Sequence, residues 1–444
     1  PLAPLAAFAY NGGTEIRASP CKEHGRLPNF NLSDEVFTRA AQQFPTPFFL
    51  YDEQGIRQAA HGLQEAFSWN PRFKEFFAVK AQPNPHILKL LLDEGCGLDC
   101  SSMTELMMAE RLGVRGADLM FSANAMPPEE FAYARRLGAT INLDDISDIY
   151  TLLAHGGIPE TICMRYNPGG LFGDGNAIMG SPKDSKFGWT REQLSEGLMR
   201  LKALGVKRFG LHAFLASNML GEVYYPLLAK LLFETGKELT AESGLPLDFI
   251  NLSGGIGIPY KPEDSPADIA LIGRRVQEDY EESFGDSELD NIAVKTELGR
   301  YITGPYGWLV TRAMHEKRIH KHYIGVDACA VNLLRPAMYG AYHHIHIAGK
   351  RDDPATETYD ITGALCENND KFAIDRRLPE VEMNDLLIIH DAGAHGAAMG
   401  YQYNGRLRAA EVLHRADGSF QLIRRAETQE DYFATLHGEG LPAF

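Results

Sequence analysis

The chain has 444 residues, of which 44% are hydrophobic and 23% are charged, and its formal net charge at pH 7 is -16. A chain of this size exceeds one ordinary hydrophobic core, so we expect two packed domains, and the composition is too apolar for disorder. The negative charge argues against a nucleic acid or an anionic membrane as partner, since either one favours a basic surface. These features predict a soluble protein that binds a small molecule.

Cysteine usage and hydropathy indicate the compartment. The six cysteines form no CxxC pair and are too sparse for a disulfide scaffold, which is typical of a reducing cytoplasm. The opening segment PLAPLAAFAY has no basic region, and no later window approaches eighteen uninterrupted apolar residues. We therefore predict neither a targeting segment nor a membrane span.

From about residue 47, apolar runs alternate with amphipathic stretches. The predicted strands are PFFLYD, EFFAVK, GLDCSS, DLMFSA, ATINLD, TICMRYN, RFGLHAFLA, DFINLSGG and IAVKTELGR. Segments of helical period lie between them, such as PPEEFAYARRLG, and several end at a glycine suited to a helix C-terminus. This alternation predicts a parallel sheet with crossover helices, and the absence of a lone dinucleotide fingerprint favours a closed (β/α)8 barrel over an open sheet.

The pattern changes after about residue 310. Short strand-like runs with polar alternation follow, and ADGS between two of them predicts a hairpin. We expect a barrel domain at 47–312 and a mainly antiparallel β domain, a β-barrel or sandwich, at 313–444. Residues 1–46 form an N-terminal segment that packs on one of the two domains, with the β domain as a candidate.

Barrel enzymes place their chemistry at the C-terminal ends of the strands. Lys80 ends the second predicted strand, and a lysine at such a mouth is a candidate for a Schiff base, because partial desolvation releases the free amine that attacks an aldehyde. A lysine paired with a carboxylate is the alternative. Other polar residues fall at the remaining strand ends: Asp99, His212, Ser217, the turn 253–257 and the run 297–300.

Two further motifs suggest one cofactor. The turn SGGIG presents several backbone N–H groups, which is how a phosphate is held, although such a turn alone is more often just a tight turn. In ELGR, Glu297 is placed to meet a ring nitrogen and Arg300 to meet an anion. A lysine, a phosphate turn and an acid together indicate pyridoxal 5'-phosphate.

With these motifs the chain resembles the fold-type III, alanine-racemase-like barrel decarboxylases that use pyridoxal phosphate, and within them diaminopimelate decarboxylase and its D-lysine and D-ornithine decarboxylase relatives. The likeness runs from FFLYD to AAEVL and includes FFAVKAQPNPHILKLL, SKFG, SGGIGIPY, ELGR, LLRPAMYGAYHHI, GALCENND and DAGAHGAAMGYQYNGRLRAAEVL. The resemblance implies a barrel plus a β domain, assembled as a homodimer with active sites at the subunit interface.

The resemblance also implies roles for individual residues. Lys80 would bind the cofactor covalently, Glu297 would keep its ring nitrogen protonated, and Cys366 would enter from the neighbouring subunit as the proton donor. Cofactor contacts are expected from Asp99, Phe214, Ser217, Gly254, Gly255, Gly257, Gly299, Arg300 and Tyr403. Substrate contacts are expected from Arg300, Arg335, Tyr339, Glu367 and Tyr403.

Plainer interpretations remain for three of these features. A free cysteine such as Cys366 is most often a small buried hydrophobe, and Arg335 before a proline could be an ordinary surface arginine. The histidines His343, His344 and His346 resemble a metal site, but no carboxylate or cysteine completes it, so a polar sheet face is the better interpretation. We predict no metal.

Several positions depart from the family pattern. Phe214 replaces the histidine that stacks on the cofactor ring, Ala216 replaces a glycine, and Leu298 replaces a proline; CENND also differs from the usual CES followed by Asp. The departures favour a paralogue with an altered substrate. We therefore predict decarboxylation at a D-configured α-carbon, of D-lysine or D-ornithine to cadaverine or putrescine, with meso-2,6-diaminopimelate giving L-lysine as the near-equal alternative.

Two other classes of function are more distant. An amino acid racemase would share the barrel and the cofactor but would want an arginine at the pyridine nitrogen, where this chain has Glu297. A catalytically inactive regulatory homologue would be free to lose the lysine and the proton donor, and both Lys80 and Cys366 are present.

Overall fold

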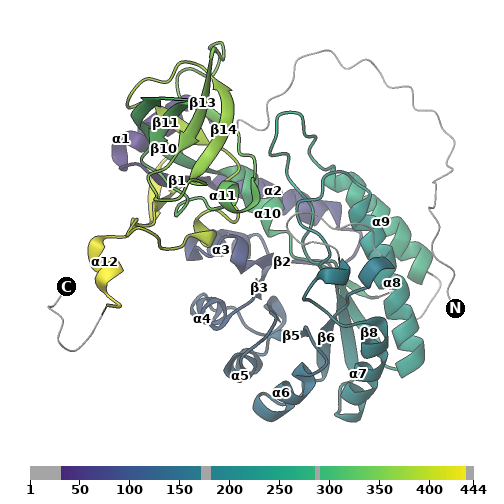
Figure 1. Cartoon of the computed structure of the whole chain (residues 1–444). Helices are drawn as coiled ribbons and strands as arrows, with labels where there is room; N and C mark the ends of the chain where they lie inside the picture. The colour runs from purple at the N-terminus through teal and green to yellow at the C-terminus, as the bar shows by residue number, and fades with distance from the viewer. Residues whose placement is uncertain (1–31, 172–181, 286–290, 437–444) are drawn as a thin grey trace, which may run out of the picture.

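The chain folds into two bodies, a ring of helices around a barrel and a separate sheet (Figure 1). The structure is a computed structural model that describes residues 32–171, 182–285 and 291–436. The first body is a closed barrel of parallel strands, and the second is a nine-stranded, mostly antiparallel sheet. The predicted combination of a (β/α)8 barrel and a β domain is confirmed.

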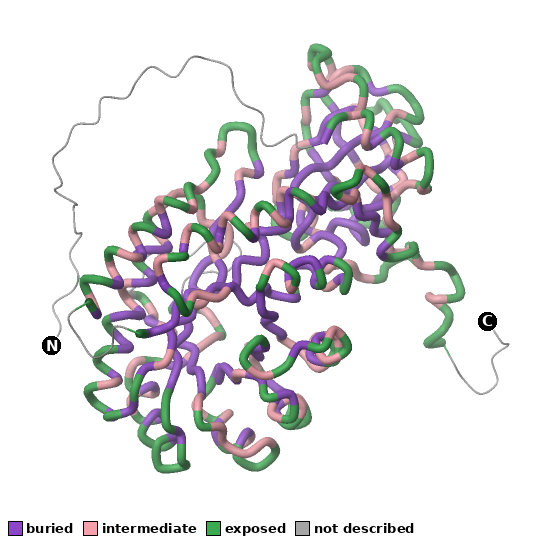
Figure 2. Tube along the Cα trace, turned by 180° about the vertical axis from the view of Figure 1, so that it is seen from behind, coloured by how far each residue is buried: buried purple, intermediate pink, exposed green. Residues whose placement is uncertain are grey.

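Eight parallel strands form the barrel, and the pairing of β9 with β2 closes it. In chain order they are β2 (Lys74–Ala78), β3 (Gly97–Cys100), β4 (Leu119–Ser122), β5 (Thr140–Leu143), β6 (Thr161–Arg165), β7 (Arg208–His212), β8 (Leu247–Asn251) and β9 (Ala293–Thr296). Figure 2 shows these strands almost entirely buried, as expected for a parallel sheet that is covered on its outer face by helices and filled by side chains inside.

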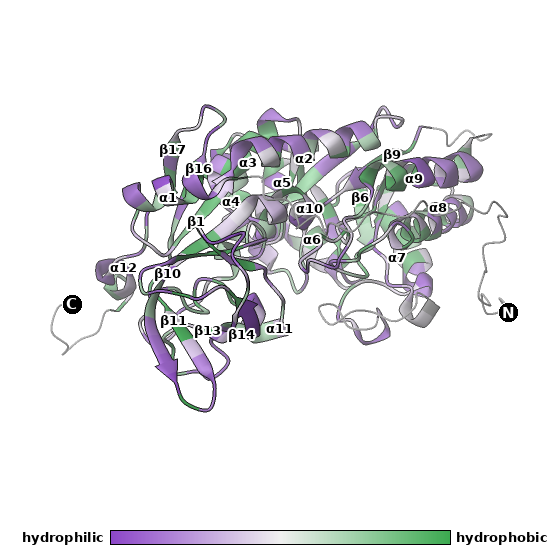
Figure 3. Cartoon of the chain, turned by 90° about the horizontal axis from the view of Figure 1, so that it is seen from above, coloured by the Kyte–Doolittle hydropathy of each residue, from purple (hydrophilic) through white to green (hydrophobic). Residues whose placement is uncertain are grey.

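Helices between the strands form the outer ring. They are α2 (Glu53–Ala66), α3 (Pro85–Asp93), α4 (Met103–Arg111), α5 (Pro128–Leu137), α6 (Asp148–His155), α7 (Arg191–Ala203), α8 (Tyr224–Ser243) and α9 (Ile269–Phe284). Their ends follow local signals: the Asn84 side chain accepts from His86 N at the start of α3, and Gly138 ends α5 in the left-handed conformation. Figure 3 shows hydrophilic and hydrophobic residues mixed along α2 and α9, which fits helices with one face on the barrel.

A layer of large side chains fills the barrel interior. Phe76, Met120, Cys163 and Phe249 come from the alternate strands β2, β4, β6 and β8, and they form one buried cluster. The neighbouring strand β7 makes room with a glycine: a Cβ atom on Gly210 would lie 2.2 Å from the Phe249 ring. The layer makes the barrel a packed core, so ligands have access only at its mouth.

The β domain contains nine strands. They are β1 (Phe48–Asp52), β10 (Gly307–Arg318), β11 (His322–Val326), β12 (Ile345–Ile347), β13 (Glu357–Thr362), β14 (Lys371–Leu378), β15 (Leu386–Ile389), β16 (Ala410–His414) and β17 (Phe420–Arg424). The predicted ADGS hairpin is present as the antiparallel pair β16 and β17. Short helices α10 (Gly299–Thr303), α11 (Arg335–Tyr339) and α12 (Gln429–Phe433) complete the described chain.

One predicted strand belongs to the other body. The run PFFLYD was counted as the first strand of the barrel, but β1 pairs antiparallel with β10 and parallel with β16 in the β domain. Lys80 therefore follows the first barrel strand rather than the second. The count was wrong because a fully buried run of five residues looks the same in either sheet, and only the pairing partners distinguish them.

The N-terminal helix α1 (Asp34–Gln43) covers the β domain. Its buried residues Phe37 and Ala40 pack in one cluster with Phe48 and Leu50 of β1 and Trp308 of β10. From residue 32 on, the chain thus runs from the β domain through the barrel and back to the β domain. Among the described helices, none is both long enough and apolar enough to span a membrane.

Candidate active site

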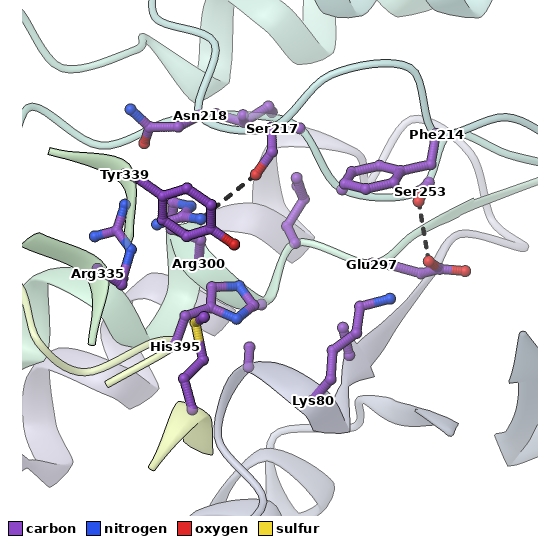
Figure 4. Close-up of a pocket in the computed structure, with 18 residues that line it drawn as sticks. Lys80, Phe214, Ser217, Asn218, Ser253, Glu297, Arg300, Arg335, Tyr339 and His395 are labelled. Atoms are coloured by element: carbon purple, nitrogen blue, oxygen red, sulfur yellow. Dashed lines mark hydrogen bonds between the residues drawn. The ribbon is translucent and has the colours of Figure 1, made fainter. Parts of the chain in front are cut away.

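Lys80 lies directly after β2, in η1 (Val79–Ala81), which is one turn of 3-10 helix. Its side chain is exposed in a pocket at the barrel mouth (Figure 4). The Nζ atom lies 5.9 Å from the centroid of the Phe214 ring. No carboxylate of the described residues forms an ion pair with Lys80. The alternative of a simple salt bridge therefore receives no support.

The pocket has a volume of about 200 Å³. It collects most of the residues predicted from the sequence: Lys80, Phe214, Ser217, Gly254, Gly255, Glu297, Gly299, Arg300, Arg335 and Tyr339. Five predicted residues are not part of its lining: Asp99, Gly257, Cys366, Glu367 and Tyr403. The remaining predicted residues thus come together from the barrel and from the β domain.

Glu297 is held as an acceptor at the end of β9. Asn251 Nδ2 donates to its Oε1 at 2.8 Å, and Ser253 Oγ donates to its Oε2 at 3.0 Å. Burial by itself favours the neutral carboxyl, but His212, Lys80 and Asn251 outweigh it and lower the pKa of Glu297. Burial lowers the pKa of His212 while the carboxylate of Glu297 raises it, so the two groups titrate as a coupled pair, and Lys80 and the hydrogen bonds also favour the anionic form of Glu297.

Asp99 near the end of β3 is buried, and its pKa is shifted in the direction opposite to that of Glu297. Burial, reinforced by the charge of Glu297, raises the pKa of Asp99 well above its usual range, against the opposing effect of Lys80. Neither carboxyl oxygen of Asp99 has a hydrogen-bond partner among the described residues. The pKa values of the two carboxyls are therefore shifted in opposite directions, which favours the negative charge on Glu297. Asp99 is not part of the pocket wall.

Backbone N–H groups of glycine residues, together with the side chains of Ser217 and Arg300, form a candidate anion site beside Lys80. A Cβ atom on Gly254 would lie 2.9 Å from the carbonyl oxygen of Glu297, and Gly255 has a φ of +125°, so both positions require glycine. Arg300 Nη2 donates to Ser217 Oγ at 3.4 Å. Amide, hydroxyl and guanidinium donors together suit a phosphate.

Gly257 has a packing role in the same turn. Its N–H donates to the carbonyl of Met219 at 2.8 Å, and a Cβ atom there would lie 2.7 Å from the backbone of Asn218. The amide of Gly257 is therefore already used within the turn. Gly257 is not part of the pocket lining, so its predicted contact with the cofactor stays a prediction. In this structure Gly257 stabilises the turn.

Phe214 presents an aromatic ring beside Lys80, as Figure 4 shows. Arg165 Cζ lies 6.0 Å from the centroid of the same ring, and Arg165 forms a buried ion pair with Asp144 at 3.2 Å. A phenyl ring offers a stacking face to a flat cofactor but no hydrogen bond.

Arg335 and Tyr339 lie on the side of the pocket away from Lys80 and Glu297 (Figure 4). Both come from α11 of the β domain. Arg335 is 3% exposed, so it is not the ordinary surface arginine of the plainer interpretation. No carboxylate among the described residues forms an ion pair with it, and burial lowers its pKa.

Cys366, Glu367 and Tyr403 form a second group outside the pocket. Cys366 is an exposed free thiol, not a buried hydrophobe, and its backbone N–H donates to Asn404 Oδ1 at 2.7 Å. Tyr403, next to Asn404, is 44% exposed. The two C-terminal motifs therefore meet each other at the surface but do not reach the pocket of their own chain.

The sequence analysis missed some residues that line the pocket: Asn218, Ser253, Ile256, His395 and Met399. Ser253 and His395 stand inside motifs that were recognised, SGGIG and DAGAHGAAMG, so proximity to those motifs was the available signal. Figure 4 shows the His395 ring between the Lys80 side and the Arg335 side. The histidines His343 and His346 are 0% and 5% exposed, and both make hydrogen bonds within the β domain.

These residues fit pyridoxal phosphate. An amine stands in the pocket without an ion pair, an ionised acid lies near it, and a glycine-walled anion site lies beside both. A ring face, Phe214, completes the set. Fold and site together define a barrel enzyme that uses pyridoxal phosphate.

Comparison with known proteins assigns the family. Residues 53–304 match the family model described as pyridoxal-dependent decarboxylase, pyridoxal binding domain. The chain belongs to this family. It is a pyridoxal-phosphate-dependent amino acid decarboxylase that resembles diaminopimelate decarboxylase.

Relatives and solved structures agree with this assignment. Protein TabA of Pseudomonas amygdali pv. tabaci is 39% identical over 94% of this chain and 96% of its own length. The diaminopimelate decarboxylase of Methanothermobacter thermautotrophicus is 35% identical over 91% and 94%. The crystal structure of diaminopimelate decarboxylase from M. jannaschii in complex with L-lysine has a TM-score of 0.81 and 28% identity, covering 91% of this chain and 94% of that chain.

Proposed function

We propose that this enzyme releases CO2 from the D-configured α-carbon of a diamino acid whose far end carries a second carboxylate, with meso-2,6-diaminopimelate as the model substrate. D-lysine and D-ornithine, which the sequence departures favour, are the second candidate. The two candidates differ in one group, the distal carboxylate. The choice between them therefore depends on the part of the pocket that would meet that group.

The supporting observation is the state of Arg335. A buried guanidinium normally has an anionic partner, because its desolvation is otherwise uncompensated. Arg335 has no such partner within ion-pair distance in the described chain, it lines the pocket, and it lies away from Lys80. A substrate carboxylate would supply the missing charge, and the planar guanidinium can bind it with two parallel hydrogen bonds.

Three of the four sequence departures lie away from the part of the pocket that would distinguish the two candidates. Phe214 lies beside Lys80, and the carbonyl of Ala216 lies against Gly255 in the anion site. The N–H of Leu298 donates to buried Glu75 Oε1 at 2.7 Å, next to Glu297. All three positions therefore lie on the cofactor side of the pocket, where meso-2,6-diaminopimelate, D-lysine and D-ornithine present the same groups.

The side chains divide the work of the reaction. Bound pyridoxal phosphate supplies an electron sink for the pair left behind by CO2. Lys80 provides the amine that holds the cofactor, the anionic Glu297 keeps a proton on the ring nitrogen, and the glycine turn with Ser217 and Arg300 orients the phosphate. Arg335 fixes the far end of the substrate, so that the reacting carbon lies on the Lys80 side.

The final proton transfer returns a proton to the carbon that has lost CO2. We assign it to Cys366 of a second copy, because Cys366, Glu367 and Tyr403 lie together at the surface and outside the pocket. This assignment includes a homodimer with shared active sites. The five cysteines that the structure describes are free thiols, which supports the predicted cytoplasmic location.

A substrate panel tests the proposal. Purified enzyme with added pyridoxal phosphate is given meso-2,6-diaminopimelate, both enantiomers of lysine and both enantiomers of ornithine, and CO2 release is measured. We expect the largest kcat/KM with meso-2,6-diaminopimelate. A larger kcat/KM with D-lysine or D-ornithine would favour the second candidate, and release from the L-enantiomers alone would refute the D-centre.

A further inference from the structure

The guanidinium of Arg335 is held from two directions. Its Nη1 lies 3.1 Å from Nε2 of His343, which follows α11 in the β domain. Its Cζ lies 4.6 Å from the centroid of the Tyr260 ring, which belongs to the loop after β8 of the barrel. The side chain is thus placed between an imidazole edge and an aromatic face.

The protonation of His343 follows from its two partners. Nδ1 of His343 lies 2.7 Å from the carbonyl oxygen of His390, and a carbonyl can only accept, so Nδ1 carries the hydrogen. Nε2 is then an acceptor and receives a hydrogen bond from Arg335. Burial, reinforced by the charge of Arg335, lowers the pKa of His343 to about 3, which keeps this tautomer neutral at physiological pH.

One hydrogen-bond partner of His343 is the backbone of His390, and the side chain of His390 belongs to a series of buried hydrogen bonds. Trp308 Nε1 donates to Nδ1 of His390 at 3.2 Å, so Nε2 of His390 donates to Nδ1 of His346 at 2.7 Å. Nε2 of His346 lies 3.2 Å from Asp34 Oδ1 at the start of α1. The orientation of His343 therefore depends on β10, β12, the end of β15 and α1, all in the β domain.

Tyr260 links Arg335 to the anion site. Its hydroxyl accepts a hydrogen bond from Arg300 Nη1, and its ring meets the His343 ring edge-on with centroids 5.2 Å apart. One aromatic ring thus lies between two guanidinium groups that would otherwise repel each other. Arg300 remains directed to Ser217, and Arg335 remains directed to the other part of the pocket.

From these contacts we propose that His343 and Tyr260 are positioning residues that hold Arg335 ready for a carboxylate at the far end of the substrate. The barrel then presents the reacting centre, and the β domain sets the selectivity for the second carboxylate through His343. This inference deepens the proposed function and rests on it.

A pair of amines tests the idea without turnover. L-lysine and cadaverine differ only by one carboxylate, and their affinities for the enzyme loaded with pyridoxal phosphate are measured by calorimetry. His343→Leu removes the acceptor and should weaken L-lysine binding about 10-fold while changing cadaverine binding less than about 2-fold. His343→Gln places an acceptor near the former Nε2 and should recover part of the loss.

Tyr260→Leu removes the aromatic ring that contacts the guanidinium of Arg335, so it tests the idea independently of His343. It should also weaken L-lysine selectively, whereas Tyr260→Phe, which keeps the ring face, should retain the preference. His322, a histidine of the β domain that contacts Glu316, serves as the control, and His322→Gln should leave the ratio of the two affinities unchanged.

The outcomes separate this inference from the proposed function. If the unmodified enzyme prefers L-lysine and that preference survives in both His343→Leu and Tyr260→Leu, the positioning role is overturned and the function stands. If the unmodified enzyme binds both amines equally, the proposal that the substrate carries a second carboxylate is refuted. The positioning role of His343 and Tyr260 is then refuted as well.

Discussion

His212 Nε2 lies 3.6 Å from Glu297 Oε1 inside the barrel, where burial lowers the pKa of the imidazole. We propose that the negative charge of Glu297 serves the ring nitrogen of the cofactor and that decarboxylation depends on this charge.

Glu297→Gln tests the importance of that charge. The amide can still accept a hydrogen bond from Asn251, so the local structure should persist, but the variant cannot stabilise a protonated ring nitrogen. We expect cofactor content to stay near one per chain and kcat to fall about 100-fold or more. Absorbance of the bound cofactor and CO2 release provide the two measurements; an unchanged kcat would remove the charge of Glu297 from the mechanism.

Lys80 and Lys295 are two lysines of the same barrel with different surroundings. Lys295 Nζ lies 3.7 Å from the centroid of the Phe249 ring, and burial lowers its pKa to about 8. Lys295 is not part of the pocket lining, whereas Lys80 is. A lowered pKa alone would favour Lys295, but access to the cofactor favours Lys80.

Borohydride reduction of the enzyme with pyridoxal phosphate should therefore attach a pyridoxyl group to Lys80, and peptide mapping should find none on Lys295. Lys80→Ala should abolish the mass increase, and Lys295→Met, the matched control, should retain it. A label on Lys295 would show that access at the barrel mouth does not decide the attachment.

Glu75 lies in β2 opposite Thr296 of β9, and Leu298 N and Thr296 Oγ1 donate to its carboxyl oxygens. Burial raises the pKa of Glu75 to about 8. Because this folded-state pKa lies above the unfolded value, the stabilising contribution of the protonated carboxyl is complete below about pH 4.5 and is lost as the pH rises towards 8.

Glu75→Gln should remove this pH dependence, because the amide oxygen keeps an acceptor for Leu298 N and the side chain does not ionise. The free energy of unfolding, measured in urea at pH 5.5 and pH 8, should fall more in the unmodified enzyme than in the variant, by about 1 kcal/mol or more. Equal pH dependence in both would show that Glu75 does not titrate in this range.

Mixing two inactive variants tests the shared active site. Lys80→Ala lacks the cofactor attachment, and Cys366→Ala lacks the proposed proton donor. If a pocket uses Cys366 of the partner chain, unfolding and refolding the two variants together should restore activity in up to about a quarter of the sites. Each variant refolded alone is the control, and a mixture no more active than these would argue that Cys366 does not act across an interface.

Much of the cofactor side of the site was predictable from the sequence. Lys80, the SGGIG turn, Glu297 and Arg300 each stand at the end of a predicted strand, and the ends of parallel barrel strands must meet at one mouth. Alternation of apolar runs with helical segments was sufficient for the barrel itself, because both periods are local properties of the chain.

Contacts between distant segments decided the rest. A buried run such as PFFLYD satisfies either sheet equally well, so only its pairing with β10 and β16 assigns it to the β domain. In the same way, the sequence contains Arg335 and His343 but cannot show that the guanidinium is buried and held by an imidazole. Hydrogen bonds and burial across hundreds of residues depend on the packed fold, whereas helix ends, turns and strand periods depend on neighbours in the chain.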